Sequence, residues 1–222
     1  MVSSPRLRVV RKNAAAGRIN AAAAARAGKG AVIGLALCAF GSLPALAGGP
    51  MATGGLTSQP IGHYDFCKSH RSECSIRPAE LAPATMNGVL WQQLASVTAA
   101  VNAAVKPMSD ADIYGKDEVW AYPDNGLGDC EDYVLEKRRQ LSRLGISLAN
   151  LLITVVRKPD GEGHAVLTVR TSEGDYVLDN LTDKVRPWSQ TGYRFLKRQS
   201  VENTGRWVSI REGQQILVGS VQ

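Results

Sequence analysis

The spacing of apolar residues predicts one helix in the middle of the chain, and signals at the helix ends predict a second. From Thr85 to Val105, apolar side chains recur every three or four residues, which is the period of a helix with one face in a core. The dipeptide Lys106-Pro107 ends this helix. A second helix is expected from Cys130 to a C-cap at Gly145, because basic residues gather toward its end and a glycine follows them.

After residue 150 the apolar pattern is that of β-strands. Five β-type runs follow one another, and the turn-rich segments KPDGEG and TSEG separate the first three; the runs are LLITVV, HAVLTVR, DYVLDN, YRFLKRQ and RWVSI. We expect them to form an antiparallel sheet. Because the helices come first and the strands follow, the order predicts an α+β domain.

The net charge of +6 belongs to the first part of the chain. Residues 1–47 contain seven of the 26 basic residues and none of the 20 acidic ones, which leaves 19 basic against 20 acidic residues in the remainder. The basic segment is followed by an apolar run, Ala31 to Ala47, that ends in the small-x-small tripeptide Ala45-Leu46-Ala47. We therefore expect a cleaved signal peptide over residues 1–47, a periplasmic or secreted protein, and no binding to nucleic acid. The alternatives are an uncleaved membrane anchor and a start codon assigned too far upstream.

The rest of the chain has room for one domain of ordinary size. Residues 48–60 are rich in Gly, Ser, Thr and Pro, which predicts a flexible linker. The folded domain is then expected over residues 61–222.

Export would place three cysteines in an oxidising compartment. The motif FCKSHRSEC sets Cys67 and Cys74 seven residues apart, so we expect these two to form a disulfide that leaves Cys130 as the free thiol. The alternative is that Cys67 and Cys74 are reduced and buried. His63 and His70 are close to them in the sequence, but their spacing matches no standard zinc finger.

Cys130 stands among acidic residues in the motif GDCEDY. Asp129 precedes it and Glu131 and Asp132 follow it, and their charges favour the protonated thiol. As the first residue of a helix, Cys130 also meets the positive end of the helix dipole, which favours the thiolate. Helix capping by Asp129 and the acids of the first turn is an alternative explanation of the same residues.

A nucleophilic thiol needs a base, and His164 is the candidate because it opens a strand directly after a Gly-rich loop. The alternative is a surface histidine at the end of a loop. The candidates for an acid or amide that orients its imidazole are Asp175, Asp179, Asn180 and Asp183. A tight turn at Ser172-Glu173 places Asp179 diagonally across from His164, whereas a turn one residue later pairs His164 with Asp183. The pattern alone leaves both registers open.

Three motifs resemble those of the bacterial transglutaminase-like cysteine proteinases, the family of the LapG-type periplasmic proteases. They are FCKSHRSEC, DEVWAYPDNGLGDCEDYVLEKRRQL and GHAVLTVRTSEGDYVLDNL, and the resemblance extends from His63 to the C-terminus. It implies a papain/transglutaminase-like fold, in which a nucleophile at a helix N-terminus packs on an antiparallel sheet. It also implies that Cys130 is the nucleophile, His164 the base and Asp179 the orienting acid, which selects the first register.

The same resemblance implies a calcium ion bound by Asp129 and Glu131. Carboxylate oxygens suit this hard cation, and the bound ion would neutralise the negative charge that opposes thiolate formation. Helix capping explains these acids without a metal. A regulatory partner in the inner membrane is expected by analogy with the family.

These features predict an exported cysteine peptidase that cleaves a peptide bond in an envelope or surface protein. Two alternatives use the same residues differently. A transglutaminase would transfer the acyl group to an amine instead of water, and a non-catalytic binding module would keep the fold without the chemistry. Resemblance of fold does not identify the protein substrate.

Overall fold

The computed structural model describes residues 48–211. The predicted signal peptide over residues 1–47 lies outside the described residues, as does the end of the chain, residues 212–222. None of the helices between residues 48 and 211 combines the length and the apolar character that a membrane span requires.

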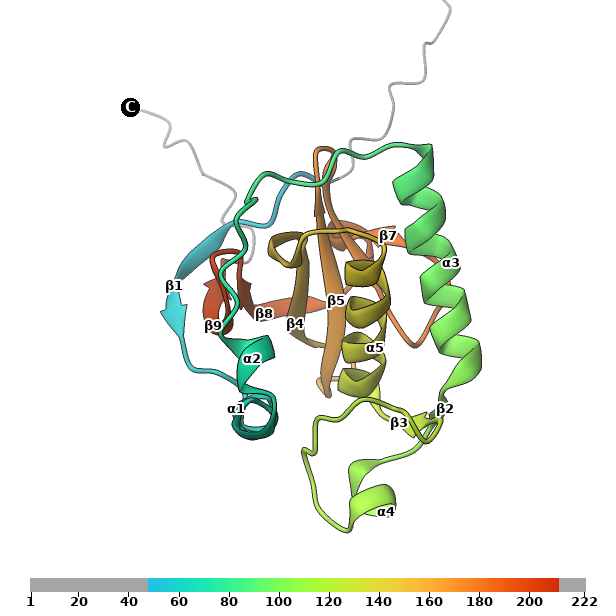
Figure 1. Cartoon of the computed structure of the whole chain (residues 1–222). Helices are drawn as coiled ribbons and strands as arrows, with labels where there is room; N and C mark the ends of the chain where they lie inside the picture. The colour runs from blue at the N-terminus through green and yellow to red at the C-terminus, as the bar shows by residue number, and fades with distance from the viewer. Residues whose placement is uncertain (1–47, 212–222) are drawn as a thin grey trace, which may run out of the picture. The chain divides into compact units, whose positions relative to one another are not determined.

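An antiparallel sheet of seven strands forms the centre of the domain (Figure 1). The strand order is β1-β9-β8-β4-β5-β6-β7. The strand bounds are β1 Thr53–Thr57, β4 Leu151–Arg157, β5 Gly163–Thr171, β6 Gly174–Leu178, β7 Arg186–Pro187, β8 Arg194–Ser200 and β9 Asn203–Ile210. Two short strands, β2 (Lys106–Pro107) and β3 (Leu127–Gly128), form a separate parallel pair. The five strands predicted from the apolar pattern all lie in the large sheet.

The longer helices precede most of the sheet in the sequence. The bounds are α1 Ile61–Ser69, α2 Arg71–Cys74, α3 Gly88–Ala104, α4 Asp110–Tyr114 and α5 Cys130–Arg143, with the 3-10 turns η1 Leu148–Asn150 and η2 Trp188–Gln190. Helix α5 lies against β4 and β5, and α3 packs beside α5 (Figure 1). The predicted α+β architecture is confirmed.

Both predicted core helices are present, with small differences at their ends. Helix α3 begins at Gly88, because the side chain of Asn87 caps it by accepting a hydrogen bond from the Leu90 N–H at 2.8 Å. Helix α5 ends at Arg143, and Gly145 lies just beyond its C-cap with a φ of 91°. Glycine adopts this left-handed conformation without steric strain.

Apolar residues are buried on both faces of the sheet. The larger cluster joins α3 and α5 to the sheet, and its fully buried members include Leu94, Leu135, Leu141, Ile153 and Leu167. Alternate residues of the strands point to the other face. There a smaller cluster contains Met51, Val156, Val166, Val177 and Phe195, with Trp188 and Tyr193 packed against it. The larger cluster holds α5 in place over the sheet.

The prediction of a flexible linker over residues 48–60 is wrong for residues 53–57, which form β1. This strand pairs with β9 at the edge of the sheet, where Thr53 lies opposite Ile210. Four of its five residues are exposed. Backbone hydrogen bonds hold the strand, so no alternation of apolar and polar residues marks it in the sequence.

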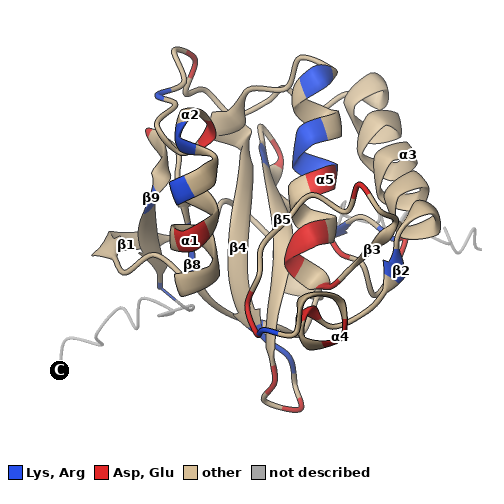
Figure 2. Cartoon of the chain, turned by 60° about the horizontal axis from the view of Figure 1, so that its bottom comes forward, with Lys and Arg blue, Asp and Glu red and all other residues tan. Residues whose placement is uncertain are grey.

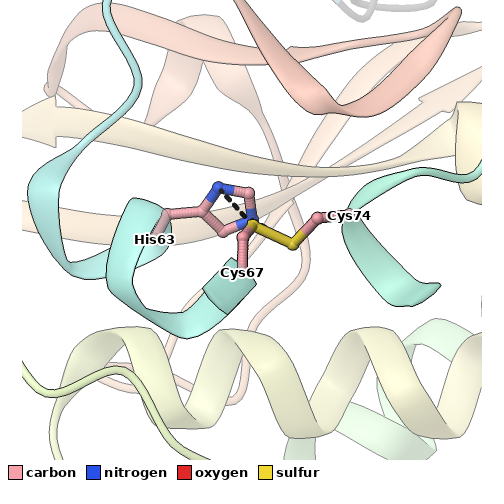
Figure 3. Close-up of side chains that lie close together, drawn as sticks. All are labelled: His63, Cys67 and Cys74. Carbon is pink, nitrogen blue, oxygen red and sulfur yellow. Dashed lines mark hydrogen bonds between the residues drawn. A yellow bond between two sulfur atoms is a disulfide. The ribbon is translucent and has the colours of Figure 1, made fainter. Parts of the chain in front are cut away.

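A disulfide joins α1 to α2 (Figure 3). The Cα atoms of Cys67 and Cys74 are 5.6 Å apart. Closing so short a loop removes about 2.5 kcal/mol of unfolded-chain entropy. The ring of His63 lies against the disulfide, with Nδ1 3.7 Å from the Cys67 sulfur. Because the two sulfur atoms are bonded to each other, they are not available as thiolate ligands for a metal with His63.

His63 is buried among aromatic rings. Trp120 and Trp207 meet its imidazole edge-on, with ring centroids 5.3 and 5.4 Å away. The Trp207 Nε1–H donates to Nδ1 of His63 at 3.2 Å. Burial, with a smaller contribution from the positive charge of Arg138, lowers the pKa of His63 to about 3. The imidazole is therefore neutral in the folded protein.

This burial predicts that the protein loses stability in acid. His63 has a pKa of 6.5 in the unfolded chain but about 3 in the folded protein, so between these values the unfolded state binds the extra proton. The contribution of neutral His63 is complete above pH 6.5 and is lost toward pH 3, with a slope of about 1.4 kcal/mol per pH unit. Chemical denaturation at several pH values should show a steeper loss for the wild type than for His63→Gln. Parallel profiles for the two proteins would exclude His63 as the responsible group.

Candidate active site

Cys130 is the first residue of α5, and its side chain is half-buried. Asp129 has the extended backbone of an N-cap residue, but its side chain makes no capping hydrogen bond. The Cys130 thiol donates a hydrogen bond to Oε2 of Glu131 at 3.0 Å. Helix capping therefore does not account for Asp129, and Glu131 faces the thiol.

The surroundings of Cys130 favour the neutral thiol. Burial raises the pKa of the thiol well above its ordinary range, and the charge and hydrogen bond of Glu131 raise the pKa further. The backbone of Ala165 acts in the opposite direction and lowers the pKa. Ala165 directly follows His164 in β5, so this contact places the thiol at the beginning of that strand.

His164 and Asp179 form a buried pair. His164 lies near the start of β5, Asp179 directly follows β6, and a tight turn that pairs Thr171 with Gly174 joins the two strands. This is the register that places Asp179 diagonally across from His164. His164 Nε2 and Asp179 Oδ1 are 2.8 Å apart. The carboxylate of Asp183 instead accepts a hydrogen bond from a side chain of α3.

Two further hydrogen bonds hold the carboxylate of Asp179. Oδ1 also accepts from the Leu181 N–H at 3.1 Å, and Oδ2 accepts from the Tyr193 hydroxyl at 2.6 Å. Burial alone would raise the pKa of Asp179, but the hydrogen bonds from His164 and Tyr193 outweigh it and bring the pKa below its ordinary value. Asp179 is therefore ionised at neutral pH and can orient the imidazole.

Among the hydrogen bonds of residues 48–211, none joins Cys130 to His164. The thiol donates to Glu131, and His164 uses Nε2 on Asp179. This leaves Nδ1 of the imidazole for another partner. The structure thus brings His164 and Asp179 into direct contact and places Cys130 at the same strand end. Hydrogen bonds between catalytic groups commonly tighten only when substrate binds.

A cluster of carboxylates lies beside Cys130. Three residues each offer an oxygen atom, and these atoms lie within 4.8 Å of one another: Asp110 of α4, the N-cap residue Asp129, and Asp132 of α5. Each of the three residues also has a buried oxygen without a hydrogen-bond partner in the described part of the chain: Asp110 Oδ1, Asp129 Oδ1 and Asp132 Oδ2. Figure 2 shows acidic positions at the end of α5 near α4, and basic positions toward the other end of α5.

The loop between α4 and α5 orients two of these acids. The Val119 N–H donates to Asp110 Oδ2 at 2.5 Å, and the Ala121 N–H donates to Asp132 Oδ1 at 2.8 Å. In both residues the second oxygen is the unpartnered one. Gly128 leaves space for Asp132, because a Cβ at Gly128 would lie only 2.7 Å from the Cβ of Asp132. The fold therefore directs the acids toward a common point.

The clustered acids resist ionisation. Burial is the largest cause for each, and neighbouring negative charge adds to it, so the pKa rises to about 6 for Asp110, about 7 for Asp132 and about 8 for Glu131. A divalent cation would compensate these negative charges. It would also give the unpartnered oxygens a partner, because they could coordinate it. A cage of carboxylate oxygens suits calcium in particular. The residues present fit such an ion.

The structure changes the set of candidate calcium ligands. The family resemblance implied Asp129 and Glu131, and the fold adds Asp110 and Asp132. Asp132 stands in the GDCEDY motif, where its position also suits helix capping. No local signal in the sequence marks Asp110, because only the fold of the intervening loop brings it to α5. Tyr193, whose hydroxyl donates to Asp179, is likewise not marked by any local signal, because only the fold brings it to the His164–Asp179 pair.

The chain is similar to a known protein family over most of its length. The family model described as bacterial transglutaminase-like cysteine proteinase matches residues 53–215. The chain therefore belongs to the bacterial transglutaminase-like cysteine proteinases. It is a cysteine peptidase with the transglutaminase-like α+β fold, as the sequence motifs predicted.

Solved structures similar to this chain include three of LapG from Legionella pneumophila. The calcium-bound LapG is 23% identical, with a TM-score of 0.48 over 56% of this chain and 70% of that chain. The EGTA-treated LapG is 25% identical, with a TM-score of 0.47 over 55% and 68% of the two chains. A further LapG structure is 26% identical, with a TM-score of 0.46 over 54% and 67%. No curated protein matches the chain in sequence.

Cys130 is the one free thiol among the described cysteines, which predicts selective alkylation. Iodoacetamide added to the non-reduced protein should label Cys130 and leave Cys67 and Cys74 unmodified. Labelling should be slow at neutral pH and faster as the pH rises, because only the thiolate reacts and burial beside Glu131 raises the pKa of the thiol. Peptide mass mapping before and after reduction measures this. A label on Cys67 or Cys74 before reduction would contradict the disulfide.

Proposed function

We propose that the protein is an exported cysteine peptidase in which Cys130 is the nucleophile, His164 the base and Asp179 the residue that orients the imidazole. The observation that carries this proposal is the buried His164–Asp179 pair, with its contact of 2.8 Å, at the strand end where the Cys130 thiol lies. A thiol at a helix N-terminus, an imidazole and an ionised carboxylate together can perform nucleophilic hydrolysis.

The contacts of His164 define its part in the reaction. Because Nε2 donates its hydrogen to ionised Asp179, Nδ1 is the basic nitrogen. Nδ1 takes the proton from the Cys130 thiol, and the sulfur attacks the carbonyl carbon of the peptide bond. Backbone N–H groups at the start of α5 stabilise the oxyanion. The imidazolium then gives the proton to the leaving amine, which leaves a thioester on Cys130. Water, deprotonated by Nδ1, hydrolyses the thioester and restores the thiol.

Calcium dependence is part of the proposal. Asp110, Asp129 and Asp132 would hold the ion through their buried unpartnered oxygens. Glu131 lies in a neighbouring group with Asp129 and Cys130. The bound ion would supply positive charge beside Cys130, where carboxylates otherwise favour the protonated thiol.

The substrate proposed is a protein of the cell envelope or surface. The leader over residues 1–47 has the pattern of an export signal, and this supports a periplasmic or secreted location. A regulatory partner in the inner membrane belongs to the same proposal. Comparison of envelope proteins from cells that make the wild type or Cys130→Ala identifies the substrate, because only the active protein should release a fragment.

Substitutions at the proposed triad test the reaction. Cys130→Ala and His164→Ala should abolish cleavage of the identified substrate. Asp179→Asn should lower kcat by about 10⁴-fold, because the amide favours the wrong imidazole tautomer. A labelled amine added to the assay separates hydrolysis from acyl transfer.

The matched control for Asp179→Asn is Asp183→Asn. It removes the same charge from an exposed carboxylate on the segment that follows β6, and its activity should stay near that of the wild type. Severe loss in Asp183→Asn together with normal activity in Asp179→Asn would overturn the assignment.

Calcium binding should be measurable without any substrate. Calcium at 100 times its dissociation constant should stabilise the wild type by about 2.7 kcal/mol, and magnesium should have little effect because it fits an irregular oxygen cage poorly. Thermal unfolding and calorimetric titration measure both. Asp132→Asn and Asp110→Asn should lose most of the calcium response. Asp117→Asn, an exposed acid of the same loop, should keep it. An unchanged thermal midpoint at millimolar calcium would refute the site.

A further inference from the structure

Tyr193 contacts both members of the His164–Asp179 pair. Its hydroxyl donates to Asp179 Oδ2 at 2.6 Å. Its ring meets the imidazole of His164 edge-on, with the centroids 5.7 Å apart and the ring planes at 71°. The family motifs in the sequence do not include this residue, because it lies in a later segment of the chain.

The fold holds Tyr193 in this place. The segment from η2 to β8 leads from the β7 end of the sheet to the position of β8 beside β4. Along it, Gly192 adopts a φ of 75°, and the Tyr193 N–H donates to Thr191 Oγ1 at 3.3 Å. The Tyr193 ring packs against the smaller apolar cluster, whose members include Val177 and Phe195. Its position is therefore set before any substrate arrives.

The two oxygens of Asp179 have different partners. Oδ1 accepts from His164 and from the Leu181 N–H, whereas within residues 48–211 Oδ2 accepts from Tyr193 alone. Donors on both oxygens oppose rotation of the carboxylate about its Cβ–Cγ bond. Without the hydroxyl, Oδ2 would be a buried acceptor lacking a protein partner, and the carboxylate would be free to turn.

We propose that Tyr193 is a positioning residue for peptide hydrolysis: it fixes the orientation of Asp179 and covers the His164–Asp179 hydrogen bond against water. The inference rests on the proposed function of this pair. A fixed Asp179 keeps the hydrogen of the imidazole on Nε2 and leaves Nδ1 free to accept the thiol proton. Tyr193 acts through Asp179 and touches no reacting atom.

Tyr193→Phe tests the role of the hydroxyl because it keeps the ring. The loss of a hydrogen bond to a charged group should lower kcat by about 10- to 100-fold. KM should change by less than about twofold, since no contact with substrate is removed. The matched control is Tyr122→Phe, which also removes a phenol hydroxyl that donates to a carboxylate, that of Glu73. It should lose a similar amount of thermal stability and keep its kcat. A normal kcat in Tyr193→Phe, or equal losses of kcat in both variants, would overturn the inference.

A double-mutant cycle separates a positioning role from a general structural one. Introduced into Asp179→Asn, the Tyr193→Phe change should have less than about a twofold further effect on kcat, because its route of action is already removed. The same fold loss in both backgrounds would contradict action through Asp179. If Asp179→Asn itself leaves kcat unchanged, the proposed triad fails, and the inference fails with it. If Asp179→Asn is damaging and Tyr193→Phe is silent, the positioning role alone fails.

Discussion

The packing of α5 against β4 and β5 is the interaction on which the site depends. Fully buried Leu135 and Leu141 fix the helix along its length against strand residues such as Ile153. This contact sets the first residue of the helix, Cys130, at the beginning of β5, where His164 lies. A slip of one helical turn would move the thiol by about 5.4 Å and separate it from the strand. Apolar contacts well away from the thiol therefore decide where the sulfur of Cys130 lies.

The same helix gives two carboxylates opposite environments. At its N-terminus, burial and mutual repulsion raise the pKa of Glu131, and the nearby thiol remains protonated. Farther along, the fully buried Lys137 lies close enough to Asp179 for the two charges to interact, although burial lowers the pKa of Lys137 to about 8. Asp179 also has three hydrogen-bond donors and is ionised. Near α5, Glu131 thus favours its neutral form and Asp179 its charged form. Different surroundings in one fold give similar groups different chemical properties.

Local patterns in the sequence predict the two long helices and five strands of the large sheet, and they offer Cys130 and His164 as candidate site residues. The apolar periods give α3 and the inner strands, and the signals at the helix ends give α5. The local pattern leaves two registers open between β5 and β6, and only the resemblance to the family selects the one that joins His164 to Asp179. The apolar pattern does not predict strand β1, because backbone hydrogen bonds at the edge of a sheet need no alternation of apolar and polar residues. Asp110 and Tyr193 are not predicted either, because each reaches the site from another segment of the chain. An aspartate is ordinary at the start of a helix, and a tyrosine is ordinary beside a strand. Both residues owe their place in the site to long-range contacts, and a local pattern in the sequence contains no information on such contacts.

The pairing of β1 with β9 has a consequence for the order in which the domain is completed. Thr53 and Ile210 are partners, so the sheet joins segments from opposite ends of the described chain. A chain that leaves the ribosome with its N-terminus first exposes β1 long before β9 exists. Contacts between such distant segments form late, because the entropy of closing the intervening loop must be overcome first. Until then the outer edge of β9 has unpaired backbone groups that can pair with another chain. Strand β1 is thus the first strand to be synthesised and the last to pair. It can join the sheet only after β9 has left the ribosome.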